Sequence, residues 1–203
     1  MINIRKFNDY EIPKRERIDS LDIKENLKQN FFGRCAYCNC HYKTLTGLEY
    51  QIEHIIPKKK AEDNGKPELR DDYNNMVYAC KKCNLYKSQT WPFDDYDLNH
   101  TYDKDLGVGF YDPCLVDFNS IFYRDEYGII MSDDRVGQYM IDKLKLYTLF
   151  RSVAWYCDKL KNLQRRLIEK KKGLGDKPEI NSAIADIAVK LQSYLDYISA
   201  CLN

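Results

Sequence analysis

The stretch NNMVYACKKCNLYK, residues 74–87, joins an apolar run, a Cys-x-x-Cys pair and a basic segment. The run MVYA at 76–79 predicts a short strand, and we expect a helix to begin at about residue 81. Cys80 and Cys83 lie where the two elements meet. Because a two-residue spacing lets one tight turn direct two thiolates at one ion, the stretch predicts half of a metal site.

A second pair of the same kind, CAYC at 35–38, precedes the first with 41 residues between them. Two such turns complete a tetrahedral sulfur site suited to zinc, whereas a single pair is also compatible with chance or with redox chemistry. A site closed by four thiolates has no open position, so this zinc is expected to stabilise the fold and take no part in chemistry. The predicted ligands are Cys35, Cys38, Cys80 and Cys83, with Cys40 as a rival ligand. The remaining cysteines are expected to be plain buried thiols: Cys114, Cys157 and Cys201.

The chain between the two pairs carries the candidate catalytic residues. It includes EYQIEHIIPKKK at 49–60, in which a histidine follows a glutamate at the end of a strand-like run. A metal that joins residue 35 to residue 83 holds this segment at both ends, so its polar residues are brought together. They are Glu53, His54, Asn75 and Asn84, and Lys81, Lys82 and Lys87 add positive charge for a phosphate.

The chemistry of these side chains points to a second metal ion. A carboxylate and a carboxamide are hard oxygen ligands that suit Mg²⁺ or Mn²⁺ better than zinc. A neutral imidazole beside them can take a proton from water. The structural alternative is that His54 is only a hydrogen-bonded residue at the end of a strand.

Together these stretches resemble a known family, the HNH endonucleases, which have a ββα-metal fold. The resemblance rests on YQIEHIIPK at 50–58 and on residues 74–87, framed by the two cysteine pairs, and covers about residues 31–90. By position, His54 matches the general base and Glu53 the metal-binding acid before it. Asn75 matches the middle asparagine, which holds the loop and orients the histidine. Asn84 matches the third motif position, where families carry His or Asn, and Lys87 matches the lysine that often follows.

The resemblance implies metal-assisted hydrolysis of phosphodiester bonds in DNA. Glu53 and Asn84 would hold one Mg²⁺ or Mn²⁺ on the scissile phosphate, and His54 would activate a water. Lys87 or a neighbouring lysine would neutralise charge on the phosphoryl oxygens. Glu53 stands where Asp is commoner and so reaches one methylene further, and Asn84 in place of His favours Mg²⁺ or Mn²⁺. Contacts would go mainly to the nucleic-acid backbone, so little sequence preference is expected.

The pattern of the whole chain predicts an α+β fold with a ββα-metal core. The expected parts are an N-terminal arm and helix (1–30), the HNH core with its zinc site (31–92), an acidic segment with a hairpin (93–135) and a C-terminal helical region (136–203). Ser20 is expected to cap the first helix, and residues 58–73 are expected to be a polar loop. Pro92 is expected to end the helix that begins at about residue 81.

Two further patterns predict the second half of the chain. The runs SIFYR and GIIMS, joined through DEYG, predict a hairpin. Leucines and isoleucines at helical spacing form one stripe from about 138 to 171 and a second from 180 onward, separated by GLGDKP. The two stripes predict an antiparallel helical pair that covers the first module.

Charge and hydropathy limit the possible partners. The chain has 203 residues and a net charge of +1, with no apolar run long enough for a membrane span and no secretory signal at its start, so a cytoplasmic protein is expected. Residues 91–134 contain eleven acidic and two basic residues, whereas residues 135–172 contain eleven basic and three acidic residues. This asymmetry permits nucleic-acid binding without establishing it, because charge runs are also common on solvated faces.

The flanking segments carry a second resemblance. YDPCLVDFNSIFYRDEYGIIMS and IDKLKLYTLFRS are similar to the tail of HNH proteins from bacterial anti-phage systems, including Septu and retron-associated types. That resemblance implies an ATPase partner protein. Three alternatives stay open: an RNA-cleaving, toxin-type nuclease that uses the same site, a non-catalytic zinc-ribbon module that binds nucleic acid, and a subunit that is silent until a partner activates it.

Overall fold

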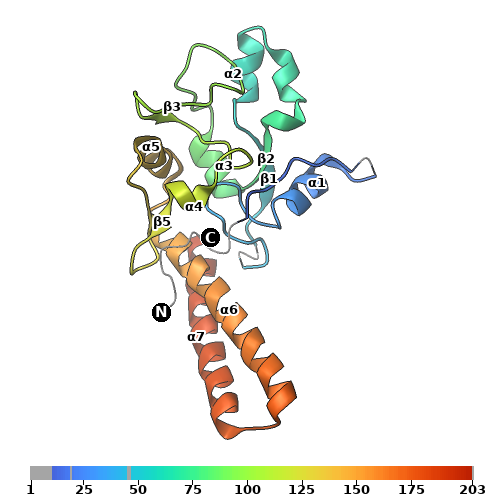
Figure 1. Cartoon of the computed structure of the whole chain (residues 1–203), viewed down its shortest axis with the longest axis vertical. Helices are drawn as coiled ribbons and strands as arrows, with labels where there is room; N and C mark the ends of the chain where they lie inside the picture. The colour runs from blue at the N-terminus through green and yellow to red at the C-terminus, as the bar shows by residue number, and fades with distance from the viewer. Residues whose placement is uncertain (1–10, 19, 45–46, 203) are drawn as a thin grey trace.

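Helices and small antiparallel sheets make up the described chain, which confirms the α+β prediction. A computed structural model describes residues 11–18, 20–44 and 47–202, and Figure 1 shows a mixed upper body from which two long helices extend. None of the helices in these ranges is both long and apolar enough to cross a membrane.

The centre of the body is a strand pair followed at once by a short helix. Strand β1 (Tyr50–His54) pairs antiparallel with β2 (Met76–Cys80), and the register places Tyr50 opposite Cys80 and His54 opposite Met76. Every residue of β2 is buried, as its apolar sequence requires, and helix α3 (Lys81–Lys87) begins at the next residue. This is the ββα arrangement expected for residues 31–92.

The connection between the two strands is more ordered than the expected polar loop at 58–73. It contains helix α2 (Lys58–Asp63) and two 3-10 turns, η1 (Pro67–Arg70) and η2 (Tyr73–Asn75). The apolar Ala61 and Leu69 side chains are buried and anchor α2 and η1 against the body. Two apolar residues in a charged sequence were too weak a signal to predict these turns.

Two expected helix boundaries are also corrected. Helix α1 (Ile23–Asn30) is capped by Asp22, whose side chain accepts a hydrogen bond from the backbone N–H of Glu25, and not by Ser20. Helix α3 ends at Lys87, before the Trp91–Pro92 pair, because Ser88 adopts a positive φ of 46° and closes the last turn.

The acidic segment folds over the same body through short elements. The predicted hairpin is confirmed: β5 (Tyr123–Arg124) pairs with β6 (Ile130–Met131). A second pair that the sequence did not predict, β3 (Tyr102–Asp103) with β4 (Val108–Gly109), precedes helix α4 (Phe118–Ile121). Phe110 follows β4 and is fully buried, which brings this segment against the core.

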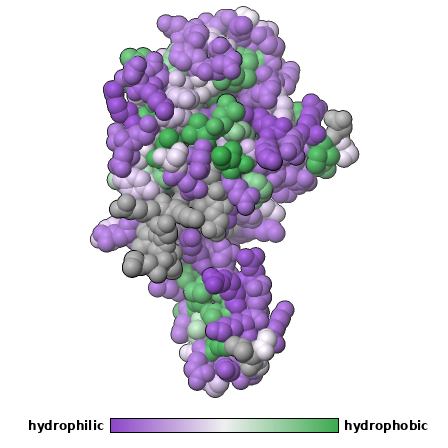
Figure 2. Space-filling view, in the orientation of Figure 1, coloured by the Kyte–Doolittle hydropathy of each residue, from purple (hydrophilic) through white to green (hydrophobic). Residues whose placement is uncertain are grey.

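The expected single helix from 138 to 171 is two helices. Helix α5 (Arg135–Leu144) ends where Lys145 adopts a left-handed conformation, and α6 (Leu149–Leu174) starts a new direction before α7 (Pro178–Leu202) returns. The antiparallel pair α6–α7 is confirmed, but most of it extends away from the body and does not cover the first module (Figure 1). In Figure 2, apolar residues gather along the pair.

Candidate functional site

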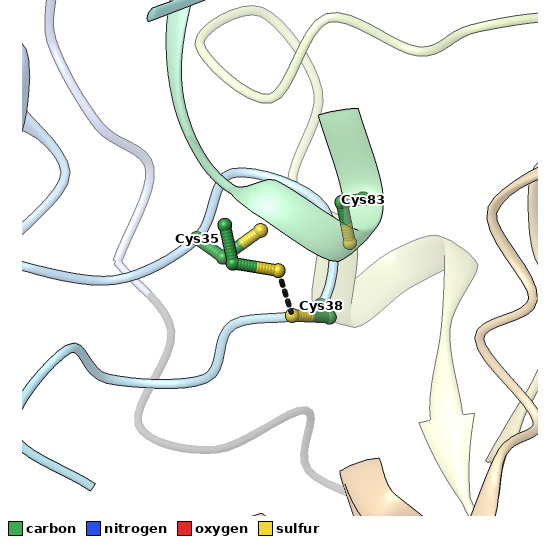
Figure 3. Close-up of side chains that lie close together, drawn as sticks. Cys35, Cys38 and Cys83 are labelled. Atoms are coloured by element: carbon green, nitrogen blue, oxygen red, sulfur yellow. Dashed lines mark hydrogen bonds between the residues drawn. The ribbon is translucent and has the colours of Figure 1, made fainter. Parts of the chain in front are cut away.

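Four cysteines from three parts of the fold meet at one buried point. Cys35 and Cys38 lie in the turn after α1, Cys80 ends β2, and Cys83 lies in the first turn of α3. Their sulfur atoms all lie within 4.8 Å of one another. Figure 3 shows the sulfur atoms of Cys35, Cys38 and Cys83 directed toward a common point.

The geometry of this cluster fits a tetrahedral metal ion. With a zinc–sulfur bond of about 2.3 Å, the edge of a tetrahedron of sulfur atoms is about 3.8 Å long. The Sγ atoms of Cys38 and Cys80 are 3.9 Å apart, close to that edge and far longer than a disulfide bond. Four buried thiolates this close together repel one another, so a bound cation is needed to hold them in the ionised form.

The cluster is distinct from the other cysteines. Cys40, the rival ligand, is buried nearby, but the cluster of mutually close ligand atoms does not include it. Within residues 11–18, 20–44 and 47–202, no other group of three or more His, Cys, Asp or Glu side chains has this geometry. The two Cys-x-x-Cys pairs therefore come together as the sequence predicted.

A polar pocket of about 320 Å³ lies beside this centre, between β1 and α3. Three of the sequence-predicted site residues line it: Glu53, His54 and Asn84. Helical periodicity explains why α3 serves both sites. Lys81, Asn84 and Ser88 recur every three to four residues on the pocket face, whereas Cys83 is directed into the core.

His54 is oriented by a backbone carbonyl that the sequence did not indicate. Its Nε2 atom lies 2.9 Å from the carbonyl oxygen of Arg70. A carbonyl can only accept a hydrogen bond, so Nε2 carries the proton and a neutral imidazole keeps its lone pair on Nδ1. Burial lowers the pKa of His54, which favours this neutral form. The arrangement is suited to a general base that accepts a proton at Nδ1.

Asn75 is fully buried and holds the loop next to this carbonyl. Its Oδ1 accepts a hydrogen bond from Ile56 N at 2.8 Å, and its Nδ2 donates to the carbonyl oxygens of Ile56 and Leu69, each at 2.9 Å. These three hydrogen bonds hold the loop, and the role of Asn75 in orienting the histidine stays a prediction. Its effect on His54 is indirect, because it fixes Leu69, the residue before the carbonyl of Arg70.

Asn84 is positioned by a second residue that the sequence did not indicate. Its Nδ2 donates to Oε1 of Gln51 at 2.7 Å, which leaves the amide oxygen Oδ1 as the atom available to a cation. Gln51 and Glu53 are two residues apart on β1 and therefore point to the same side of the strand. That alternation is the sequence signal by which Gln51 could have been found.

The position of Lys87 does not agree with the expectation that it adds positive charge for a phosphate. Its side chain is fully buried, with Nζ 2.9 Å from Oε1 of Glu53, 2.8 Å from the carbonyl oxygen of His54 and 5.0 Å from the ring centre of Phe110. Burial lowers the pKa of Lys87, and Glu53 opposes that shift. Lys87 is not among the residues that line the pocket, and its ammonium group instead stabilises Glu53 and the His54 carbonyl.

Exposed lysines line the pocket in place of Lys87. They are Lys58, at the start of α2, and Lys81, at the start of α3. Lys82 is directed elsewhere: its Nζ donates to the carbonyl oxygen of Cys201 at 2.9 Å and lies 5.0 Å from the ring centre of Phe150. Of the three lysines expected to add charge for a phosphate, only Lys81 lines the pocket, and its Nζ lies 3.5 Å from Glu49.

The segment that holds the strand pair, the short helix and the histidine-bearing pocket is similar to known proteins. Residues 35–90 match the family model described as HNH endonuclease, a segment of little more than a quarter of the chain. A curated relative is Septu protein PtuB of Bacillus mycoides (strain KBAB4), 30% identical over 82 residues. The match covers 36% of this chain and 27% of the relative, so the chain spans only about a quarter of that protein's length. No solved structure matches the chain.

Proposed function

We propose that this chain is a metal-dependent HNH endonuclease that hydrolyses phosphodiester bonds of DNA with little sequence preference. The observation that carries the proposal is the state of His54, a pocket histidine whose Nε2 donates to the Arg70 carbonyl and whose Nδ1 is left to accept a proton. Glu53 and Asn84 line the same pocket. A carboxylate, an amide oxygen and a neutral imidazole are the groups that such a reaction requires.

Each pocket residue has a separate task in this reaction. Glu53 and Asn84 would hold a Mg²⁺ or Mn²⁺ ion, and Gln51 keeps the Asn84 amide turned so that its oxygen is available. The bound ion would polarise the scissile phosphate and stabilise the leaving 3′ oxygen. Nδ1 of His54 takes a proton from the attacking water, and the Arg70 carbonyl keeps the ring in the required orientation during the transfer.

The lysines at the mouth of the pocket are suited to hold the substrate. Lys58 and Lys81 are exposed, and each begins a helix on one side of the pocket. Ammonium groups placed there attract a phosphodiester backbone without reading bases, so sequence preference should be slight. We include these two lysines in the site in place of Lys87.

The four-cysteine cluster is proposed to hold a structural zinc ion. Its sulfur spacing fits a tetrahedral site, and four protein ligands leave no position for a substrate or a reacting water. The proposed catalytic and structural ions would therefore have separate ligands, with Asn84 and Cys83 both supplied by the short helix α3.

The biological setting is proposed from the relative and from the resemblance of the flanks. The relative is a Septu protein, and the flanks of this chain are similar to HNH proteins of anti-phage systems. We infer that the chain is the nuclease of such a defence system, acts in the cytoplasm and works beside an ATPase partner. Affinity purification of the tagged chain from its native host, followed by a search for a co-purifying ATPase, would test the last point.

Substituting His54 with alanine tests the catalytic proposal. Purified wild-type and His54→Ala proteins are incubated with plasmid DNA and Mg²⁺, Mn²⁺ or EDTA. Loss of a positioned base should reduce cleavage by about 10²–10⁴-fold while the melting temperature and DNA affinity stay near those of the wild type. His100→Ala is the matched control, because His100 is an exposed histidine paired with Asp95 outside the pocket. A stable and fully active His54→Ala protein would exclude the nuclease proposal.

The alternative substrates and the non-catalytic alternative are separated by the same assay. A toxin-type ribonuclease would cleave RNA and spare plasmid DNA, with the same dependence on His54. A zinc-ribbon binding module would bind nucleic acid but cleave neither substrate with any divalent ion. A subunit that is silent until a partner activates it would cleave nucleic acid only when that partner is added.

A further inference from the structure

A groove lies between α6 and α7 near the far end of the helical pair, close to the turn that joins the two helices (Figure 1). Its volume is about 590 Å³. Lys171 and Lys172 line one edge, and the Lys171 ammonium group is already paired with Asp176 at 2.7 Å. The rest of the lining is mainly apolar and includes Ile168, Ile184, Ala185 and Ala188.

The side of α6 that borders this groove is strongly basic. Residues 165–172 contain five Lys or Arg and one Glu. Arg165, Ile168 and Lys172 recur every three to four residues, so they lie on one face of the helix, and all three are exposed. A surface that is apolar in its middle and positively charged at its edge fits an occupant with an apolar tip and negative charge beside it.

The turn of the β5–β6 hairpin, residues 125–128, has this complementary character. Residues 125–134 contain four Asp or Glu and no Lys or Arg. The side chain of Tyr127 is 68% exposed, and Glu126 beside it is exposed as well. Tyrosine is enriched among the residues that supply most of the binding energy at protein interfaces. We refer to residues 125–128 as the hairpin tip.

The hairpin tip is held at the opposite end of α6 from the groove. The Tyr156 hydroxyl of α6 donates to the carbonyl oxygen of Glu126 at 3.0 Å. Gly128 packs against the ring of Trp155. Ile168 in the groove lies about 18 Å further along the helix than Tyr156, at 1.5 Å per residue. The tip of one chain therefore does not reach the groove of the same chain.

A second copy of the chain can make this contact twice. If the α6–α7 pairs of two copies run antiparallel, the far end of each pair lies beside the body end of the other. Each hairpin tip then meets the groove of the opposite copy. One two-fold rotation generates both contacts, which is the usual symmetry of a protein dimer.

We propose that the chain forms a two-fold dimer in which the hairpin tip of each copy occupies the α6–α7 groove of the other. In this dimer Tyr127 enters the apolar groove, and Glu126 pairs with Lys172 at its edge. Val189, which is 73% exposed and follows Ala188, is covered by the same contact. The inference goes beyond the proposed nuclease activity and does not depend on it.

Nucleic acid is the alternative occupant of this part of α6. A phosphate backbone would be attracted to Arg165 and Lys172, as any polyanion would be. It has no apolar tip to fill a groove of isoleucine and alanine side chains. The apolar lining therefore favours a protein occupant, and the hairpin tip combines the apolar side chain and the negative charge that the groove fits.

The test exchanges the charges of one proposed contact in the full chain. Lys172→Glu alone places like charges at both contacts of a dimer, and so does Glu126→Lys alone. In an equal mixture of the two variants, a mixed dimer has one exchanged contact and one wild-type contact, and both are attractive. Self-association is measured by analytical ultracentrifugation from about 1 μM to about 1 mM protein. The controls change exposed charges outside the contact: Lys190→Glu and Asp105→Lys.

We expect the wild type to form dimers that weaken as salt is added, because part of the attraction is screened. Each single charge variant should raise the dissociation constant by about 10-fold or more, since like charges then face each other. The equal mixture and the double variant should recover the wild-type value, and both controls should match it. Tyr127→Ser should also weaken the dimer by about 10-fold or more, because it removes the side chain that fills the groove.

Three results would overturn the proposal. A wild type that stays monomeric over the whole range leaves the groove to another molecule, and weaker plasmid binding by Lys172→Glu would then identify nucleic acid as its occupant. Dimers that Lys172→Glu and Glu126→Lys leave unchanged have their interface elsewhere. Folded variants whose mixture does not recover association do not pair through these charges. If a charge variant does not fold, Tyr127→Ser decides, since wild-type association in that variant also overturns the proposal.

Discussion

Replacing Lys87 with methionine distinguishes a lysine that stabilises the fold from one that acts on a phosphate. The Lys87 ammonium group is fully buried, pairs with Glu53 at 2.9 Å and donates to the His54 carbonyl at 2.8 Å. Methionine keeps the apolar stem beside Phe110 but removes the charge and the donor. Lys87→Met therefore deprives a buried carboxylate of its counter-charge and a carbonyl oxygen of its donor.

The size of the effect follows from these losses. Removing one partner of a buried ion pair costs about 3–5 kcal/mol, because the other charge is left without compensation. Burial raises the pKa of Glu53, and loss of Lys87 raises it further, so the carboxyl group can take up a proton and limit the cost. We expect a loss of about 3 kcal/mol in the free energy of unfolding, which corresponds to roughly 10 °C in Tm for a chain of this size.

The pH dependence of the loss has a definite sign. When the pKa of a carboxyl group is higher in the folded than in the unfolded state, the folded state binds the proton more readily, so stability rises as the pH falls. The Lys87→Met protein should therefore lose less stability relative to the wild type at pH 5 than at pH 8. Protonation removes the uncompensated charge of Glu53.

The interaction energy of the Lys87–Glu53 pair is measured by urea denaturation of four proteins: wild type, Lys87→Met, Glu53→Gln and the double variant. The double variant should be more stable than Lys87→Met alone, because the orphaned carboxylate is gone. Lys59→Met is the control, since Lys59 is exposed on α2. If Lys87→Met unfolds within about 0.5 kcal/mol of the wild type, the range of ordinary surface substitutions, while cleavage collapses, the lysine acts on the phosphate and the buried pair is not its main role.

The remaining predictions concern the two metal sites and the base. Metal analysis of the wild type should find one zinc per chain, and Cys80→Ser should leave the module unfolded or insoluble; folded, zinc-free wild type would refute this. Glu53→Ala should lose cleavage that high Mn²⁺ partly restores, whereas Mn²⁺ should not restore His54→Ala. Asn75→Ala should cost about 3 kcal/mol of unfolding free energy in denaturant titrations, because the buried Ile56 N–H and Leu69 carbonyl lose their partner. Burial lowers the pKa of His54. A pH–rate profile should therefore show cleavage falling only below about pH 6.5, the ordinary pKa of histidine. Stability should also decrease below this pH, because the unfolded chain takes up a proton more readily than the folded chain.

The sequence could predict the elements whose signals are local. The spacing of the two Cys-x-x-Cys pairs predicted the cluster, and the apolar run MVYA predicted β2 almost to the residue. The pairing of β5 with β6 followed from two β-rich runs around a turn. In each case the residues that determine the structure lie close together in the chain or share a ligand geometry.

Features determined by distant contacts could not be predicted in this way. Burial of Lys87 depends on Phe110, which arrives from the acidic segment, and the orientation of His54 depends on a backbone carbonyl, which any residue at position 70 supplies. The division between α5 and α6 occurs at Lys145, a residue without a breaker signal that adopts a left-handed conformation. Contacts between residues far apart in the chain determine these features, so neither composition nor periodicity could predict them.

The short helix α3 shows why the two proposed metal sites depend on each other. It has seven residues, and isolated helices shorter than about 12–15 residues are marginal in water, so its position depends on its contacts. Cys83 fixes its first turn through the cysteine cluster, and Lys87 fixes its last turn through Glu53 and the His54 carbonyl. Asn84 lies between these two anchors. We therefore expect the four-cysteine centre to support the proposed catalysis without touching the substrate, by holding Asn84 in the pocket that Glu53 also lines.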